Sequence, residues 1–228
     1  MPPSGATQNH PDNPKHATGH VEHMTPLAVS QAAAEVLGTI ELDPASTPAA
    51  NEAIGARRIF TVADNGLQHE WRGRTFLNPP GGLVDLLGNP VVRASKATGE
   101  PGCTVSGSCG LAAPHQHKSV TSSAVFWWRK LARHWAAFDV EAAIFVGFSI
   151  ELLQSTQSGA PQGVPLPLDF PFCVPSARLE FLSEDAWGQL VPGTQPTHAN
   201  VIVYLPPRFD ARCELFAAAF SKIGRVRL

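Results

Sequence analysis

The segment Asn78-Pro79-Pro80 combines residue types that could hold an amino group in place. Proline fixes φ at about −65° and has no N–H, and the residue before a proline is pushed toward extended geometry. This Asn-Pro-Pro arm is therefore stiff, and its backbone offers carbonyl acceptors and almost no donors. The side-chain oxygen of Asn78 and the carbonyl of Pro79 would present two acceptors, which match the two N–H donors of a planar amino group.

Two acceptors placed in this way would have a chemical use. The lone pair of an exocyclic base amine is delocalised into the ring, and acceptors that pull on its hydrogens return electron density to the nitrogen. Such an amine could attack a sulfonium methyl group without a strong general base, because positioning would supply most of the rate. Gly81-Gly82 follow the arm, and their permissive φ would let a base approach the backbone or let the next loop move.

The elements that would position this arm alternate between helices and strands. This alternation predicts an α/β, Rossmann-like fold, a mostly parallel sheet with helices on both faces. In such sheets, ligands bind outside the carboxyl ends of the strands, and both Asp43-Pro44 and the Asn-Pro-Pro arm lie at predicted strand ends. We expect helices within residues 25–38, 45–53, 124–138, 150–155 and 213–223, and strands within residues 39–42, 58–61, 74–77, 141–148, 178–182 and 199–205.

The length and composition favour one globular domain with an irregular start. A chain of 228 residues, with 43% apolar and 16% charged residues, is long enough for one hydrophobic core and short for two. Residues 1–20 are polar and rich in Pro, His, Asn and Gly, which predicts a disordered tail before a single domain at residues 21–228. Residues 82–123, dense in Gly, Ser and Pro, are expected to form a long loop insertion.

Charge and cysteine content limit the partners and the compartment. A net charge of −2 excludes a protein that coats nucleic acid by bulk electrostatics, so any DNA contact must be local. The tail lacks the apolar core of a secretory signal, and the longest apolar run, residues 142–148, is far below the roughly 20 residues that cross a bilayer. Four cysteines without a disulfide pattern suit a reducing compartment, so we expect no membrane partner and a cytoplasmic location.

Several segments, taken in their order along the chain, resemble the phage-type DNA N6-adenine methyltransferases. These enzymes use S-adenosylmethionine and carry an Asp- or Asn-Pro-Pro-aromatic motif. The resemblance covers about residues 22–205, and it implies DNA as partner, the cytoplasm of a bacterial host as location and a phage gene as one origin. The segments that carry it are HMTPLAV (23–29), IELDPASTPAAN (40–51), IFTVADNGLQHEW (59–71), TFLNPPGG (75–82), RLEFL (178–182) and HANVIVYLPP (198–207).

The resemblance also implies roles for particular residues. Asn78 and Pro79 would bind the target amine, and Pro80 would stiffen the loop. Asp64 stands where related enzymes place an acid that accepts from the adenine amine of the cofactor. The residues that would line the S-adenosylmethionine site are Thr25, Pro26, Asp43, Pro44 and Ala45.

The sequence departs from the family pattern at two places. The usual aromatic residue that stacks on the flipped base is Gly81 here, so the stacking surface must come from elsewhere or be absent. Trp127, at the border of the basic side of its helix, is one candidate for that surface, with core packing as the alternative. The glycine-rich cofactor loop common in methyltransferases is replaced by residues 45–48, which the pattern of this subfamily tolerates.

Other interpretations of these residues stay open. Cytosine N4 also carries two N–H donors, and a catalytically silent DNA-binding or protein-binding module could share the fold. The Asn-Pro-Pro arm could be a strand-ending turn, Asp43 a helix cap, and Asp64 part of an Asx-type turn. The irregular segments at residues 82–123 and 161–175 are candidates for target recognition, and Arg129, Lys130 and Arg133 for phosphate contacts or for a solvated face.

Four residues of the long loop invite a zinc interpretation, since sulfur and imidazole are the usual zinc ligands. Their spacing matches no standard two-plus-two knuckle, and the segment is short of core residues. We therefore expect no metal and a disordered or DNA-contacting loop instead. The four residues are Cys103, Cys109, His115 and His117.

Overall fold

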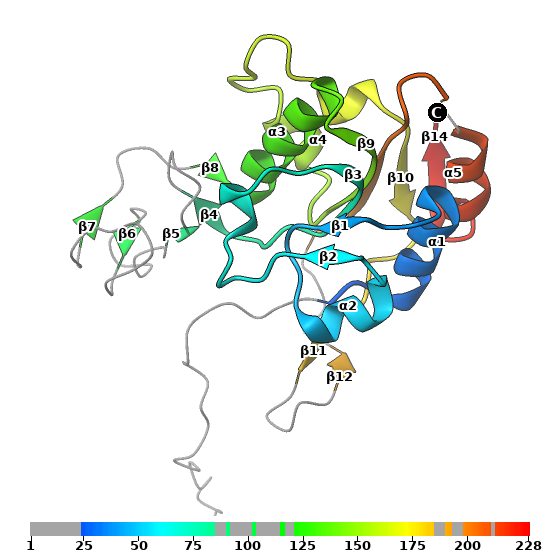
Figure 1. The fold of residues 1–228 in the computed structure, drawn as a ribbon, viewed down its shortest axis with the longest axis horizontal. Helices are drawn as coiled ribbons and strands as arrows, with labels where there is room; N and C mark the ends of the chain where they lie inside the picture. The colour runs from blue at the N-terminus through cyan, green and yellow to red at the C-terminus, as the bar shows by residue number, and fades with distance from the viewer. Residues whose placement is uncertain are drawn as a thin grey trace, which may run out of the picture.

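The computed structural model describes residues 24–84, 90–91, 102–103, 115–116, 121–184, 190–192, 198–210 and 213–228. In this part the chain has an α/β fold, a seven-stranded sheet with helices packed on both faces (Figure 1). The tail expected at residues 1–20 and most of the expected loop at 82–123 lie outside the described residues. No helix of the described part is long and apolar enough to span a bilayer.

The sheet has a parallel half and an antiparallel half, in the order β14-β10-β13-β9-β3-β1-β2. β2, β1, β3 and β9 run parallel, as predicted. β13 runs antiparallel to both β9 and β10, and β14 runs antiparallel to β10, so the whole sheet is mixed. The strands are β1 (Leu42–Asp43), β2 (Arg58–Ile59), β3 (Gly73–Leu77), β9 (Val140–Gly147), β10 (Phe172–Pro175), β13 (Val201–Leu205) and β14 (Gly224–Arg227).

Three smaller sheets in the described part of the chain lie outside the main one. β4 (Leu83–Val84) pairs with β5 (Pro90–Val91) and with β8 (Thr121–Ser122). β6 (Gly102–Cys103) pairs with β7 (His115–Gln116), and β11 (Leu182–Glu184) pairs with β12 (Leu190–Pro192).

Among the residues that the structure describes, five α-helices accompany the sheet, and the signals that begin and end α2 are clear. Thr47 accepts a hydrogen bond from the N–H of Ala50 at 3.1 Å, Pro48 occupies the first turn, and Gly55 closes the helix with φ of 69°. The helices are α1 (Leu27–Leu37), α2 (Pro48–Ile54), α3 (Ser123–Ala136), α4 (Leu152–Ser155) and α5 (Cys213–Phe220), with 3₁₀ turns η1 (Gly66–Gln68) and η2 (Pro167–Asp169).

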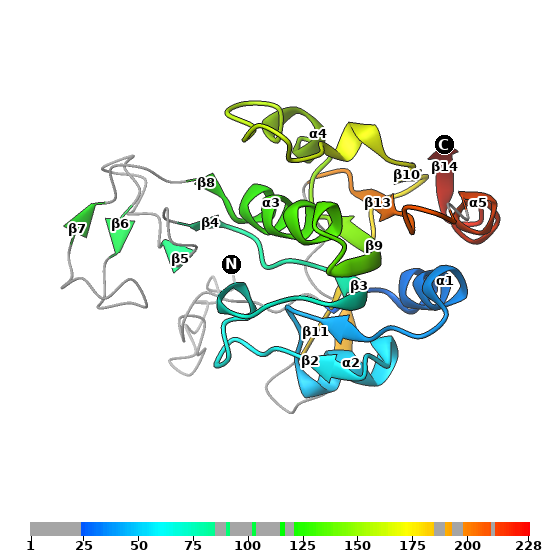
Figure 2. The same ribbon diagram turned by 45° about the horizontal axis from the view of Figure 1, so that its top comes forward.

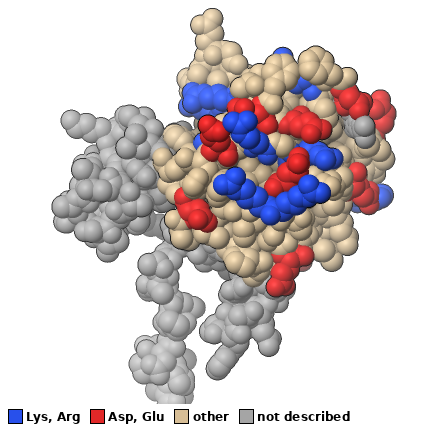
Figure 3. All heavy atoms as spheres, in the orientation of Figure 1, with Lys and Arg blue, Asp and Glu red and all other residues tan. Residues whose placement is uncertain are grey.

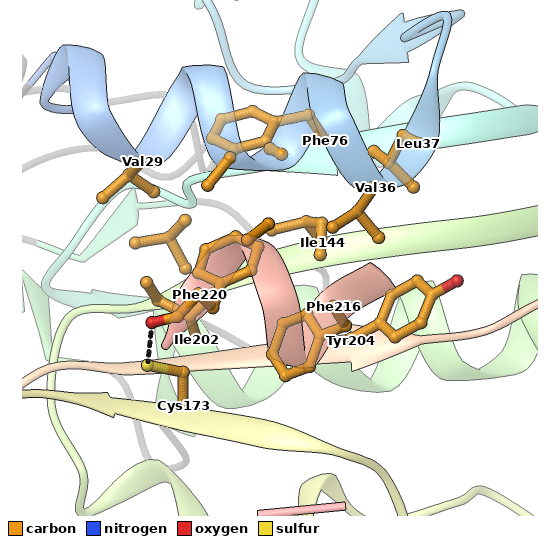
Figure 4. Close-up of a cluster of buried hydrophobic side chains, with 14 of the residues drawn as sticks. Val29, Val36, Leu37, Phe76, Ile144, Cys173, Ile202, Tyr204, Phe216 and Phe220 are labelled. Carbon is orange, nitrogen blue, oxygen red and sulfur yellow. Dashed lines mark hydrogen bonds between the residues drawn. The ribbon is translucent and has the colours of Figure 1, made fainter. Parts of the chain in front are cut away.

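One face of the sheet, here called the α1 face, is covered by α1, α2 and α5. Figure 4 shows Val29 and Val36 of α1 packed over Phe76 and Ile144 of the sheet, with Phe220 of α5 in the same cluster. Its members are buried and apolar, and successive strand residues alternate between faces, so every second strand side chain joins this cluster. Burial of this area is the main favourable term that holds these helices to the sheet.

The opposite face, here called the α3 face, is covered by α3 and α4 (Figure 2). Trp128 and Leu131 of α3 are buried against Leu77, Phe145 and other residues of the strands. The Trp128 Nε1–H donates to the Pro165 carbonyl at 3.0 Å, which satisfies the polar end of a buried ring. The amphipathic helix predicted at residues 124–138 is thus confirmed.

Two strands of the antiparallel half are not among the predicted elements. β10 lies within the segment predicted as a proline-rich loop, and the four-residue edge strand β14 follows the last helix. The strand predicted at residues 178–182 is wrong, because only Leu182 belongs to a strand and that strand lies in a separate sheet. Leu179 and Phe181 are buried, which imitates strand alternation, but the Leu179 N–H donates to the Asn200 side chain at 3.0 Å instead of to a neighbouring strand.

Candidate active site

The two motifs predicted to carry chemistry lie at the ends of adjacent parallel strands. From β1 the chain first forms β2 on one side and then returns to form β3 on the other side of β1, so the strand order reverses between β1 and β3. In α/β sheets, ligands bind in the crevice outside the carboxyl ends of the strands at such a reversal. Asp43 ends β1 and Asn78 directly follows β3, so both motifs flank this position.

Asp43 and Asn78 are directed to the same face of the sheet. Leu42 is level with Thr75, which places Asp43 level with Phe76, a member of the α1-face cluster. The proline after Asn78 keeps that residue extended, so alternation directs its side chain to the α1 face as well. Asn78 lies two residues beyond Phe76, roughly 7 Å further along the strand direction at the usual rise per residue.

Asp43 is a buried carboxyl group whose state depends on its surroundings. Its exposed fraction is 3%, and the Ala45 N–H donates to its Oδ1 at 3.1 Å. Burial raises the Asp43 pKa to about 7, although hydrogen bonds from the Ala45 N–H and the Ser46 hydroxyl lower it in part. The helix-cap interpretation does not describe this residue, because Thr47 caps α2.

No basic side chain of the described residues forms an ion pair with Asp43. A cation bound beside this carboxyl would stabilise its charged form and offset the desolvation that raises its pKa. S-adenosylmethionine carries positive charge at its sulfonium and its ammonium group. The Asp43 carboxyl therefore suits the positive charge of the predicted cofactor. Pro44 is buried and Ala45 half-buried beside it.

The start of α1 reaches the same edge of the sheet, here called the carboxyl edge. Only a few residues connect Leu37, the end of α1, to β1, so α1 runs back along the sheet and its first turn lies toward the carboxyl ends of the strands. Thr25 is buried, Pro26 precedes the helix, and the first turn holds no acidic residue. The N–H groups of this turn present a partial positive charge at that edge.

Asp64 is held in a tight turn after β2. Its Oδ2 accepts from both the N–H and the hydroxyl of Thr61, each at 2.8 Å, and these bonds lower its pKa. The turn lies at the carboxyl end of β2, where Ser46 N–H donates to the Phe60 carbonyl at 2.9 Å and ties the loops after β1 and β2 together. The carboxylate thus has a local structural role, and an adenine amine would be an additional donor to it.

The Asn-Pro-Pro arm leads from the core to the surface. Asn78 is half-buried and Pro79 buried, whereas Pro80, Gly81 and Gly82 are exposed. The Gly82 carbonyl accepts from the Ser123 N–H at 2.9 Å, which connects the end of the arm to the start of α3. A Cβ added at Gly81 would meet no atom within 4 Å, so packing does not require glycine there.

Trp127, one candidate for stacking on a base, belongs to the core instead. Its exposed fraction is 5%, and its ring is stacked on Trp71 with centroids 5.5 Å apart. The basic side of α3 is also engaged: Lys130 Nζ donates to the Leu67 carbonyl at 3.0 Å, and Arg129 Nη2 donates to the Ser158 carbonyl at 2.8 Å. Arg133 is exposed.

The segment 161–175 does not lie beside the arm. Pro165 accepts from Trp128 of α3, and the Phe170 ring meets the Trp135 ring edge-on at 4.9 Å. The segment then enters β10 at the edge where β13 ends, because the Tyr204 N–H donates to the Pro171 carbonyl at 2.9 Å. Since β13 runs antiparallel to β9, this is the edge where β3 and β9 begin. The printed contacts of the segment thus lie along α3 and at the edge where β3 and β9 begin, and its role in target recognition stays a prediction.

Asn200, at the opposite edge where β9 ends, is a residue that the sequence interpretation missed. It is 1% exposed, accepts from the Leu179 N–H, and donates through Nδ2 to the Phe148 carbonyl at 3.1 Å. It thereby fixes the end of β9 to the chain that follows β10. A polar residue immediately before the apolar strand at 201–205 is the sequence signal that could have identified it.

A hollow of about 290 Å³ lies away from the arm, beside the starts of β1 and β2. Its two carboxylates face arginines: Glu70 pairs with Arg72 at 2.9 Å and Glu41 with Arg74 at 3.6 Å. Acidic and basic side chains are interspersed on the surface seen in Figure 3. The hollow contains none of the predicted site residues. Its lining is Glu41, Leu42, Arg58, His69, Glu70 and Arg72.

The cysteines and histidines singled out for zinc are only partly placed. Cys103 is opposite His115 in the backbone pairing of β6 and β7, whereas Cys109 and His117 lie outside the described residues. Among the residues the structure places, no group of three or more His, Cys, Asp or Glu side chains could hold a metal ion. Cys173 is buried, and burial raises the pKa of its thiol to about 11.

Comparison with models of protein families, with curated proteins and with solved structures gave no match for this chain.

Proposed function

We propose that this chain is an S-adenosylmethionine-dependent methyltransferase that modifies the exocyclic N6 amine of adenine in DNA. The observation that carries the proposal is the placement of Asp43-Pro44 and the Asn-Pro-Pro arm at the ends of two adjacent strands, at the strand-order reversal between β1 and β3. Segments that are 35 residues apart in sequence, by the numbers of Asp43 and Asn78, end at one edge and face one side. The family resemblance assigns these same two segments to cofactor and target.

The residues of the site would divide the work as follows. Asn78 Oδ1 and the Pro79 carbonyl accept from the two N–H groups of the target amine, and Pro80 keeps this pair of acceptors at a fixed separation. When bound, S-adenosylmethionine supplies a methyl group on a sulfonium centre. The amine held by Asn78 and Pro79 would accept this methyl group, the cofactor would leave as a neutral thioether, and the amine would release one proton to water.

Asp43 would hold the positively charged groups of the cofactor, and the start of α1 would hold its negatively charged group. The buried carboxylate suits the cationic groups, and the N–H groups of the first turn of α1 suit the cofactor carboxylate. Thr25 and Pro26, at that turn, and Ala45, after β1, would line the site. Asp64 would accept from the adenine amine of the cofactor.

Methylation in cells tests the proposal and identifies the base. The protein would be expressed in a bacterial host that lacks DNA methylation, and the host DNA read by base-resolved sequencing. We expect methylated adenine in a defined sequence context. Methylated cytosine N4 would correct the target while keeping the reaction, and unmodified DNA from a soluble, folded protein would contradict the proposal.

Substitution at Asn78 tests the role of the arm. Asn78→Ala removes one acceptor and should abolish methylation, whereas Asn78→Asp keeps an oxygen acceptor at the same place and should retain part of it. A fully active Asn78→Ala variant would contradict the assignment of that side chain.

A further inference from the structure

We propose that Phe148 supplies the aromatic surface on which the target base stacks, in place of the residue that follows the Asn-Pro-Pro arm. This inference rests on the proposed function. Flipping a base out of a duplex costs a few kcal/mol, and stacking on an aromatic side chain offsets part of that cost. The arm itself offers Gly81 at the position where an aromatic side chain is expected, so the surface must come from another element.

Phe148 directly follows β9, the strand next to β3, and packs on the face to which Asn78 is directed. Leu77 of β3 is level with Phe145 of β9, so Asn78 is level with Val146, whose side chain belongs to the α1-face cluster. Phe148 follows two residues later, and its ring packs against that same cluster. Among the aromatic residues of β9 and its extension, Phe145 belongs to the cluster on the α3 face.

The order of the three strands places Asn78 between two different groups. β3 lies between β1 and β9, so Asp43 is on one side of Asn78 and Phe148 on the other. A cofactor held at Asp43 would deliver its methyl group from the β1 side. A base whose amine is bound by Asn78 would then extend toward β9, where the Phe148 ring is found.

The surroundings of Phe148 fix the ring in position. Its carbonyl accepts from the buried Asn200 Nδ2 at 3.1 Å. Its ring packs against the Phe181 ring in a tilted arrangement, with ring centroids 6.3 Å apart. The ring of the exposed His198 meets it edge-on, with centroids 6.1 Å apart. The Phe148 side chain is half-buried, so part of it faces the solvent. A ring held in this way loses little rotational freedom when a base stacks on it.

Replacing Phe148 by leucine keeps apolar volume and removes the aromatic surface. We expect kcat/KM for unmethylated duplex DNA of the recognised sequence to fall roughly 10- to 100-fold, the range that base stacking provides. Affinity for S-adenosylmethionine, measured by calorimetry, should stay within a fewfold. Phe148→Tyr should keep most of the activity, because it preserves the ring.

A second substitution makes the test specific for stacking. Gly81 has open space beside it, so Gly81→Tyr can place an aromatic ring on the arm. In the Phe148→Leu background this change should recover part of the lost kcat/KM. A mismatch opposite the target adenine, which lowers the cost of flipping, should also reduce the defect of Phe148→Leu.

Several outcomes would overturn the inference. One is wild-type kcat/KM in a folded Phe148→Leu protein; another is a loss of cofactor affinity as large as the loss of kcat/KM. Phe220→Leu, which changes another buried ring of the α1-face cluster, serves as the packing control and should alter stability alone. The same kinetic defect in a folded Phe220→Leu protein would attribute the effect to packing. Failure of the proposed function is separate, since it would show as inactivity of the wild-type protein.

Discussion

Acidic side chains at the two edges of the parallel half of the sheet differ in burial and in ion pairing. The edge where β1, β3 and β9 begin is here called the amino edge. Its acidic side chains are exposed or half-buried and pair with basic side chains: Glu41 and Glu141 with Arg74, and Asp139 with His134. At the carboxyl edge, Asp43 is 3% exposed and has no ion-pair partner among the described residues. Acidic side chains at the amino edge are thus paired with basic ones, whereas Asp43 at the carboxyl edge is buried without an ion-pair partner among the described residues.

This difference shows that burial of the Asp43 carboxyl, unlike the exposed ion pairs, costs free energy when the group is charged. Exposed ion pairs contribute about 0 to 1 kcal/mol each and leave little to gain from a ligand. A buried carboxyl with a pKa near 7 is unfavourable in its charged form, and a bound cation would relieve that cost. A group that folding leaves in this state is a candidate for ligand binding.

The largest expected effect concerns the carboxyl edge and its chemistry. Removal of the Asn78 side chain should lower methyl transfer by a factor of roughly 100 or more, the scale that loss of one preorganised hydrogen-bonding group costs. Cofactor affinity should change only by a fewfold, because Asn78 would contact the target and not the cofactor. Single-turnover transfer of labelled methyl to DNA, together with calorimetry, checks both quantities.

Neutralising Asp43 should separate stability from binding. Asp43→Asn removes a buried charge, so near pH 8 we expect a free energy of unfolding higher than that of the wild type, with a change of up to about 4 kcal/mol from the pKa shift. Urea unfolding measures this effect. The same variant should bind S-adenosylmethionine more weakly, and a variant that binds equally well would remove Asp43 from the cofactor site.

The stability of the wild-type protein should depend on pH in a defined direction. The folded state holds the Asp43 proton more tightly than the unfolded chain does, since burial raises the pKa from 3.8 to about 7. The contribution of the neutral carboxyl is therefore complete below about pH 4 and is lost as the pH rises toward 7. The difference in unfolding free energy between the wild type and Asp43→Asn should show this slope and level off above it. A difference independent of pH would contradict the raised pKa.

The smallest effect is expected at the amino edge. Glu41→Gln removes one partner of the half-exposed pair with Arg74 and, since the Glu41 Oε2 also accepts from the Arg74 N–H at 2.9 Å, keeps an acceptor for that bond. The free energy of unfolding should fall by about 1 kcal/mol or less. Methyl transfer should not change, and an effect on activity as large as that of Asp43→Asn would show that the two edges do not differ in function.

The parallel half of the sheet and its helices could be predicted from local patterns. Strong apolar runs such as the one in β9, and the cap, proline and glycine signals that bound α2, are contained in a few neighbouring residues. The antiparallel half could not be predicted in the same way. Prolines at both ends of β10 indicate a loop when the sequence is considered alone. The segment is a strand because it pairs with β13 and β14, which are distant in sequence.

The candidate site shows the same division. The sequence locates Asp43 and Asn78 at strand ends, but only the register between β1 and β3 shows that both side chains face the α1 side. For Trp127 the sequence left both base stacking and core packing open, because its position on a helical wheel does not reveal that Trp71, from a distant segment, covers the ring. Phe148 carries no motif, and its relation to Asn78 depends on the pairing of β3 with β9.

Calorimetric titration of the wild-type protein with S-adenosylmethionine near neutral pH tests the central claim most directly. We predict one binding site, with release of up to about half a proton per cofactor, because a cation beside Asp43 would ionise a carboxyl whose pKa is about 7. Titrations in buffers of different ionisation enthalpy measure that proton, and Asp43→Asn should lose it. Absence of heat at millimolar cofactor would contradict the account.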